Sequence, residues 1–66
     1  MTKEEFIQDF NNKIILQAAA DEGGWDNFSL SKKNIVFEAW KEGMLKIKEI
    51  TQQVYDSIGT LPNEYK

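Results

Sequence analysis

Apolar residues recur at helical spacing over the first third of the chain. These apolar residues are Phe6, Ile7, Phe10, Ile14, Ile15 and Ala18. The residues between them form one polar face of the predicted helix. Thr2, followed three positions later by Glu5, forms a capping box, which is typical of a helix start. Gly23 provides the left-handed residue that often ends a helix. The pattern predicts a helix over residues 2–22.

A second helical pattern begins after a loop at residues 23–30 and meets no strong breaker for several turns. Ser31 is the expected N-cap, in preference to Ser29, because Leu30 then occupies the position of a hydrophobic staple. A Gly and then a Pro end the pattern. The sequence therefore predicts one long helix over residues 31–58 and a short tail over residues 59–66.

The predicted long helix carries a regular apolar seam. Its members are spaced alternately by four and three residues and are Val36, Trp40, Gly43, Ile47, Ile50 and Val54. This spacing is that of a coiled coil. Gly43 is the weak point, because a mid-helix Gly costs about 1 kcal/mol relative to Ala. We expect a continuous helix; a sharp bend at Gly43 is the alternative, and it would let the C-terminal half fold over the first helix.

The predicted fold class is all-α, an antiparallel helical hairpin in a single domain. At about 1.5 Å per residue the first helix is about 30 Å long and the second about 42 Å, so the end of the second helix lacks a cover. The tail can supply one only by folding back with Leu61 and Tyr65. We otherwise expect a homo-oligomer, most simply a two-fold dimer that forms a four-helix bundle through the seam.

Composition narrows the range of functions. The 66 residues include no Cys and no His, and every basic residue is Lys, with a net charge of −3. The usual metal ligands and the usual neutral-pH acid–base group are therefore missing, and a nucleic-acid binder would be expected to use Arg. We expect no enzyme, no metal or other cofactor, and no nucleic-acid or membrane partner. Without a basic, apolar leader the chain is expected to be cytoplasmic.

Four aromatic residues lie close together in sequence: Trp25, Phe28, Phe37 and Trp40. One interpretation is that they fill the loop end of the hairpin. The other is that some are exposed as anchors for a partner, since Trp and Tyr are frequent hot spots. Because Trp25 lies in a loop, the sequence predicts a partner-binding site formed by Trp25, Asp26 and Phe28.

The stretch Phe37–Gly43 resembles a segment of the form Phe-x-Ala-Trp-x-x-Gly that recurs in small phage and prophage proteins. The resemblance covers seven residues and transfers no functional residue. It implies a small accessory protein that binds and blocks a host protein, including a defence protein. The alternatives are an assembly protein that acts through self-association of its second helix, and a binder of a small ligand between protomers.

Overall fold

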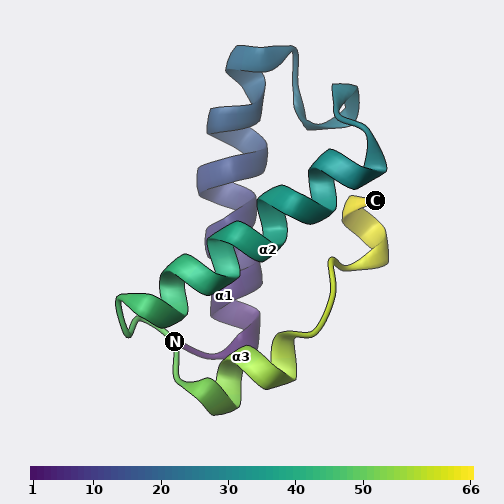
Figure 1. The fold of residues 1–66 in the computed structure, drawn as a ribbon. Coiled ribbons are helices and arrows are strands. Elements are labelled where there is room, and N and C mark those ends of the chain that lie inside the picture. Colours follow the sequence, from purple (N-terminus) through teal and green to yellow (C-terminus); the bar gives the residue numbers. More distant parts are fainter.

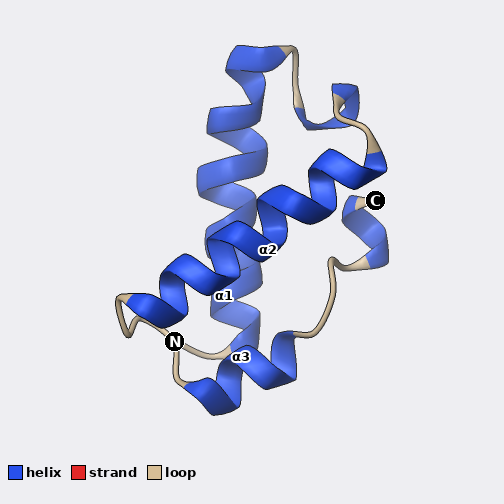
Figure 2. Cartoon of the chain, viewed as in Figure 1, coloured by secondary structure: helices blue, strands red, loops and turns tan.

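The computed structural model describes residues 1–66, which form helices and connecting turns with no strand. The α-helices are α1 (Lys3–Phe10), α2 (Leu30–Lys46) and α3 (Gln52–Ile58). The helical run that begins with α1 stands behind α2, which crosses it obliquely, and α3 lies across their lower ends (Figures 1 and 2). The all-α prediction is confirmed.

The first helical run begins at the capping box expected from the sequence. The main-chain N–H of Glu5 donates to Thr2 Oγ1 at 3.2 Å, and the N–H of Thr2 donates to Glu5 Oε1 at 2.9 Å. The N–H of Thr2 and its hydroxyl stabilise the carboxylate, so the pKa of Glu5 lies below its ordinary value of 4.5. Helix α1 therefore begins at Lys3, one residue after its N-cap.

Beyond α1 the run continues with a different winding. Residues Asn11–Ala18 are π-helical and Ala19–Glu22 form a 3₁₀ turn. The run ends at Gly23, which has φ +92°; its N–H donates to Ala20 O, and the N–H of Gly24 donates to Ala19 O. This pair of bonds is a Schellman motif. Nothing in the sequence explains the π-helical winding.

The second helix differs from the prediction at both ends. Ser29, not Ser31, is the N-cap of α2: the N–H of Lys32 donates to Ser29 Oγ at 3.1 Å. Leu30 is exposed, so it does not act as a staple. The helix ends at Lys46, and the predicted continuous helix over residues 31–58 is therefore wrong.

The break lies at Lys48 rather than at Gly43. Lys48 has φ +65°, in the left-handed region. The N–H of Lys48 donates to Leu45 O at 3.1 Å and the N–H of Glu49 to Met44 O at 2.9 Å, which is again a Schellman motif. Thr51 then caps α3, because its hydroxyl accepts from the N–H of Val54 at 3.2 Å. The chain turns, and α3 packs against both α1 and α2.

An aromatic column forms the centre of the core. Phe6, Phe10 and Phe37 are fully buried, and their rings meet edge to face, with centroids 5.8 Å apart for Phe6 and Phe37 and 5.1 Å apart for Phe10 and Phe37. Trp25 extends the column, 5.6 Å from Phe10. Such pairs add about 0.5–1.5 kcal/mol each beyond the area they bury. Smaller apolar side chains complete the core: Ala19, Met44, Ile50, Ile58 and Leu61.

The tail after α3 folds back along α2 towards the first loop (Figure 1). Leu61 is buried, and three side chains hold the main chain of the tail. Lys41 Nζ donates to Gly59 O at 2.6 Å, Trp25 Nε1 to Tyr65 O at 2.7 Å, and Lys33 Nζ to Lys66 O at 2.9 Å. The core is therefore closed by the chain's own C-terminal segment.

Candidate protein-binding surface

One side of α2 remains apolar and uncovered. Ile35 is 68% exposed and Ile47 is 66% exposed, and Ala39 and Gly43 are exposed between them. These four residues follow one another at intervals of four, so they share one face of the helix. We call them the α2 face. When large apolar side chains at this exposure are grouped, they usually mark a surface that binds another molecule.

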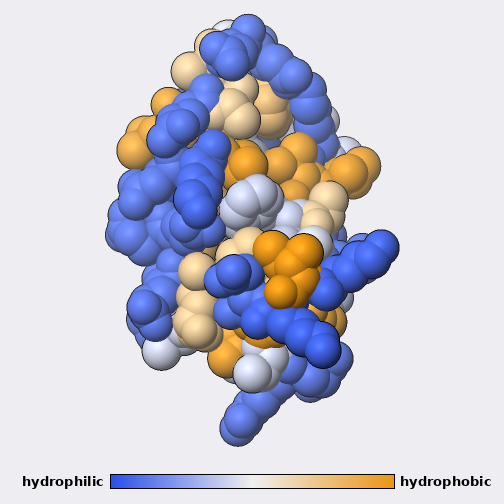
Figure 3. Space-filling view, turned by 90° about the vertical axis from the view of Figure 1, so that its left-hand side faces the viewer, coloured by the Kyte–Doolittle hydropathy of each residue, from blue (hydrophilic) through white to orange (hydrophobic).

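A hollow of about 270 Å³ lies along this face. It is lined by Ala39, Trp40, Gly43, Met44 and Ile47. A Cβ placed on Gly43 would meet no atom within 4 Å. Packing within the chain therefore does not require a glycine here, although Ala would favour the helix by about 1 kcal/mol. Figure 3 views the molecule from the side on which α2 ends, where hydrophobic groups form patches between hydrophilic side chains.

Trp40 forms one wall of this hollow and is half-buried. Its indole Nε1 is buried and donates no hydrogen bond. A buried donor without an acceptor costs about 1–3 kcal/mol. Part of the Trp40 ring therefore faces the hollow, while its Nε1 lies inside the chain without an acceptor.

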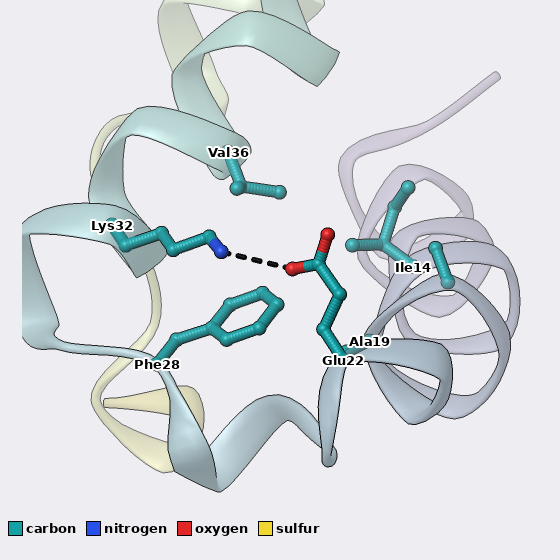
Figure 4. A pocket seen from close by; sticks show the side chains of 7 residues that line it. Ile14, Ala19, Glu22, Phe28, Lys32 and Val36 are labelled. Atoms are coloured by element: carbon teal, nitrogen blue, oxygen red, sulfur yellow. Dashed lines mark hydrogen bonds and ion pairs between the residues drawn. The ribbon is translucent and has the colours of Figure 1, made fainter.

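A second hollow, of about 180 Å³, lies between the end of the first helical run and the start of α2 (Figure 4). Its apolar lining comes from Ile14, Ala18, Ala19, Phe28 and Val36. Glu22 and Lys32 form an ion pair of 2.8 Å across it, and Lys32 Nζ lies 4.1 Å from the centre of the Phe28 ring (Figure 4). The two charges already satisfy each other, so no polar group is left here to orient a small ligand.

The predicted partner site at Trp25, Asp26 and Phe28 is not an exposed aromatic patch. Trp25 is only 6% exposed, and the prediction that it is a free anchor is wrong. Its ring packs on Phe10 and Phe28, and its indole N–H is bonded to the tail. Phe28 is half-buried, and only Asp26 is exposed. The loop aromatics instead fill the end of the core.

The predicted oligomer seam is divided by the turn at Lys48. Its last two members, Ile50 and Val54, lie beyond the turn; Ile50 is buried and Val54 packs against the core. Of the remaining members, Val36, Trp40 and Gly43 lie on α2, and Ile47 is its C-cap residue. The heptad spacing therefore does not form one continuous contact surface. The sequence signal that Trp40, Gly43 and Ile47 share a surface still holds on α2.

The acidic side chains do not gather into a metal-binding cluster. No three Asp or Glu side chains lie close enough together to hold a metal ion. None of the helices combines the length and the apolar character needed to cross a bilayer. Comparison with protein families, with curated proteins and with solved structures found no match to this chain.

Proposed function

We propose that this protein is a non-catalytic protein-binding module and that the α2 face is its docking surface. The observation that carries the proposal is the apolar hollow at Gly43, one wall of which is Ile47, a side chain that is 66% exposed. A flat polar helix surface would need no partner. Here an apolar groove crosses a position at which the chain carries a glycine that its own packing does not need.

The geometry favours a helix as the bound element. A glycine on a helix face lets a second helix approach closely, and neighbouring side chains then fit into grooves on either side. Helix-in-groove binding uses apolar anchors spaced by three or four residues. Ala39 and Gly43 on α2 and Ile47 at its C-cap provide that spacing. The partner therefore presents an apolar helix stripe to the α2 face.

The resemblance to small phage proteins extends the proposal. Of the four residues that define the segment, Phe37 lies in the core, whereas Ala39, Trp40 and Gly43 line the hollow. The segment thus contributes to the proposed docking surface rather than to the core alone. On this basis we propose that the partner is a host protein that the module inhibits by occupying a helix-binding or helical surface.

Site-specific cross-linking tests the docking surface. A photo-reactive amino acid at Ala39 is expected to cross-link a partner from a bacterial lysate, and mass spectrometry should map the adduct to a helix of that partner. Adding Ile47→Glu should reduce the yield at least tenfold, because a charge cannot be buried unpaired in the groove. The matched control is Leu16→Glu, which alters an equally exposed apolar residue on the first helical run.

Two results would contradict the proposal. One is a yield that Ile47→Glu leaves unchanged. The other is equal cross-linking from positions 39 and 16.

A second candidate function, assembly through self-association, is favoured by the charges beside the α2 face.

A further inference from the structure

The α2 face has one charged edge. Glu42 and Lys46 are both exposed, lie four residues apart on α2, and take part in none of the ion pairs of the chain. By helix geometry they stand on the side of Gly43 that also carries Ile35 and Ala39. One negative and one positive charge on the same edge are what a surface needs to match a reversed copy of itself.

We propose that the α2 face binds the α2 face of a second copy of this chain, antiparallel, about a two-fold axis at Gly43. This inference rests on the proposed function for the docking surface, and it names a second copy of the chain, in place of a host protein, as the occupant of that surface. A two-fold interface uses the same patch on both copies, so each contact occurs twice. The patch must therefore complement itself in shape and in charge.

The shape is self-complementary about Gly43. Ala39 and Ile47 are each four residues from Gly43, on opposite sides of it. In an antiparallel pair centred on Gly43, Ile47 of each copy lies beside Ala39 of the other, so a large side chain meets a small one. The two glycines face each other at the axis, where the absence of side chains allows the helices to approach closely. The hollow beside Gly43 receives Ile47 of the second copy.

The charges are self-complementary in the same arrangement. Glu42 precedes Gly43 by one residue and Lys46 follows it by three. With a rise of about 1.5 Å per residue, the two-fold axis places Lys46 of the second copy within about 3 Å of Glu42 along the helix direction, on the same edge. Two symmetric Glu42–Lys46 pairs result. A parallel two-fold pair would instead place this edge of each copy at the opposite side of the interface, so Glu42 and Lys46 would form no pair across it.

Charge exchange tests both the occupant and the orientation. Glu42→Lys and Lys46→Glu each leave a single sign of charge on this edge, so two attractive pairs become two repulsive ones in the homodimer. Exposed pairs are individually weak, and together we expect the dimer dissociation constant to rise about tenfold at low salt. When the two single variants are mixed in equal amounts, opposite charges face each other in the heterodimer, so self-association should return to the wild-type level.

The measurement is analytical ultracentrifugation from micromolar to millimolar concentration at low salt, with circular dichroism to confirm unchanged helix content. The expected result is a wild-type species approaching twice the 7.7 kDa mass of the chain, weaker dimers for both single variants, and recovery in the mixture. Gly43→Leu should also abolish the dimer, and the open space at this position means that the fold tolerates it.

A wild-type chain that stays monomeric over this range would overturn the inference, and so would a mixture that dimerises no better than the single variants. These failures are distinguishable from failure of the proposed function. A monomer that still cross-links a foreign helix from position 39 retains the docking surface but has a different occupant. A monomer that cross-links nothing loses both.

Discussion

Two lysines behave as core residues in this small protein. Lys33 is 6% exposed and Lys41 is 5% exposed, and both use their ammonium groups to bind main-chain oxygens of the C-terminal tail. Lys41 also pairs with Glu38 at 3.1 Å and lies 4.8 Å from the centre of the Tyr55 ring. Burial of a cation is tolerated only when it is paired and hydrogen-bonded. Lys41 meets both conditions, whereas Lys33 is hydrogen-bonded to Lys66 O and lies 5.8 Å from the centre of the Trp25 ring without an ion-pair partner.

Lys41→Met tests how much this anchor contributes. Met preserves the length and apolar character of the side chain but leaves Gly59 O without its donor. We expect the free energy of unfolding to fall by about 1.5–3 kcal/mol, which is the usual net contribution of a hydrogen bond from a charged group. Urea denaturation measures it. Lys3→Met, at an exposed lysine outside every ion pair, should change stability by no more than about 0.5 kcal/mol; equal effects of the two substitutions would rule out an anchoring role.

At the scale of the elements, the turn between α2 and α3 depends on a lysine in a conformation that suits glycine. Lys48 at φ +65° occupies the C′ position of a Schellman motif. A side chain in the left-handed region costs about 1–2 kcal/mol. Replacing it with Gly removes this cost, but Gly also has more conformational freedom in the unfolded chain, which cancels part of the gain in stability. Lys48→Gly should therefore raise the unfolding free energy by about 0.5–1 kcal/mol. Glu42→Gly, in the right-handed interior of α2, should lower it by about 1 kcal/mol. A loss of stability in both variants would show that Lys48 is not strained.

The same turn explains which elements could be predicted. The first helical run ends at Gly23, and its end was visible in the sequence because glycine is the usual residue there. The end of α2 was not, because Lys48 gives no such signal. The spacing of four and three across Lys48 is compatible with one helix and also with two helices that face a common core. Thr51, a good N-cap followed by polar residues, is the one signal that would have located α3.

Of the candidate site, the sequence located Trp40, Gly43 and Ile47 on a common surface but misplaced Trp25. Helical spacing fixes which residues share a face, so α2 contacts could be anticipated. Whether a loop residue is exposed depends on what packs over it. For Trp25 that cover comes from a tail forty residues later in the chain, through the bond to Tyr65 O. No local pattern reports such a contact.

At the scale of the whole molecule, the tail changes the reason to expect a partner. A bare hairpin would leave the end of the second helix uncovered and would need an oligomer for stability. Here α3 and the tail close the core within one chain, with Ile58 and Leu61 buried. The chain is expected to fold alone, and binding at the α2 face is therefore an added property and not a condition for folding.

Leu61→Ala tests whether tail closure stabilises the whole fold. Leu61 is 2% exposed, and truncating a buried Leu typically costs about 2–5 kcal/mol. The free energy of unfolding of a domain of this size is only about 3–10 kcal/mol. The variant should therefore lose a large part of its stability, and its melting temperature should fall steeply. Leu16→Ala, at a leucine that is 63% exposed, is the matched control and should cost less than about 1 kcal/mol. Urea denaturation followed by Trp25 and Trp40 fluorescence measures both. Similar losses of stability for the two leucines would mean that the tail does not stabilise the core. The core of one chain would then need another source of stability, most directly a second copy bound at α2.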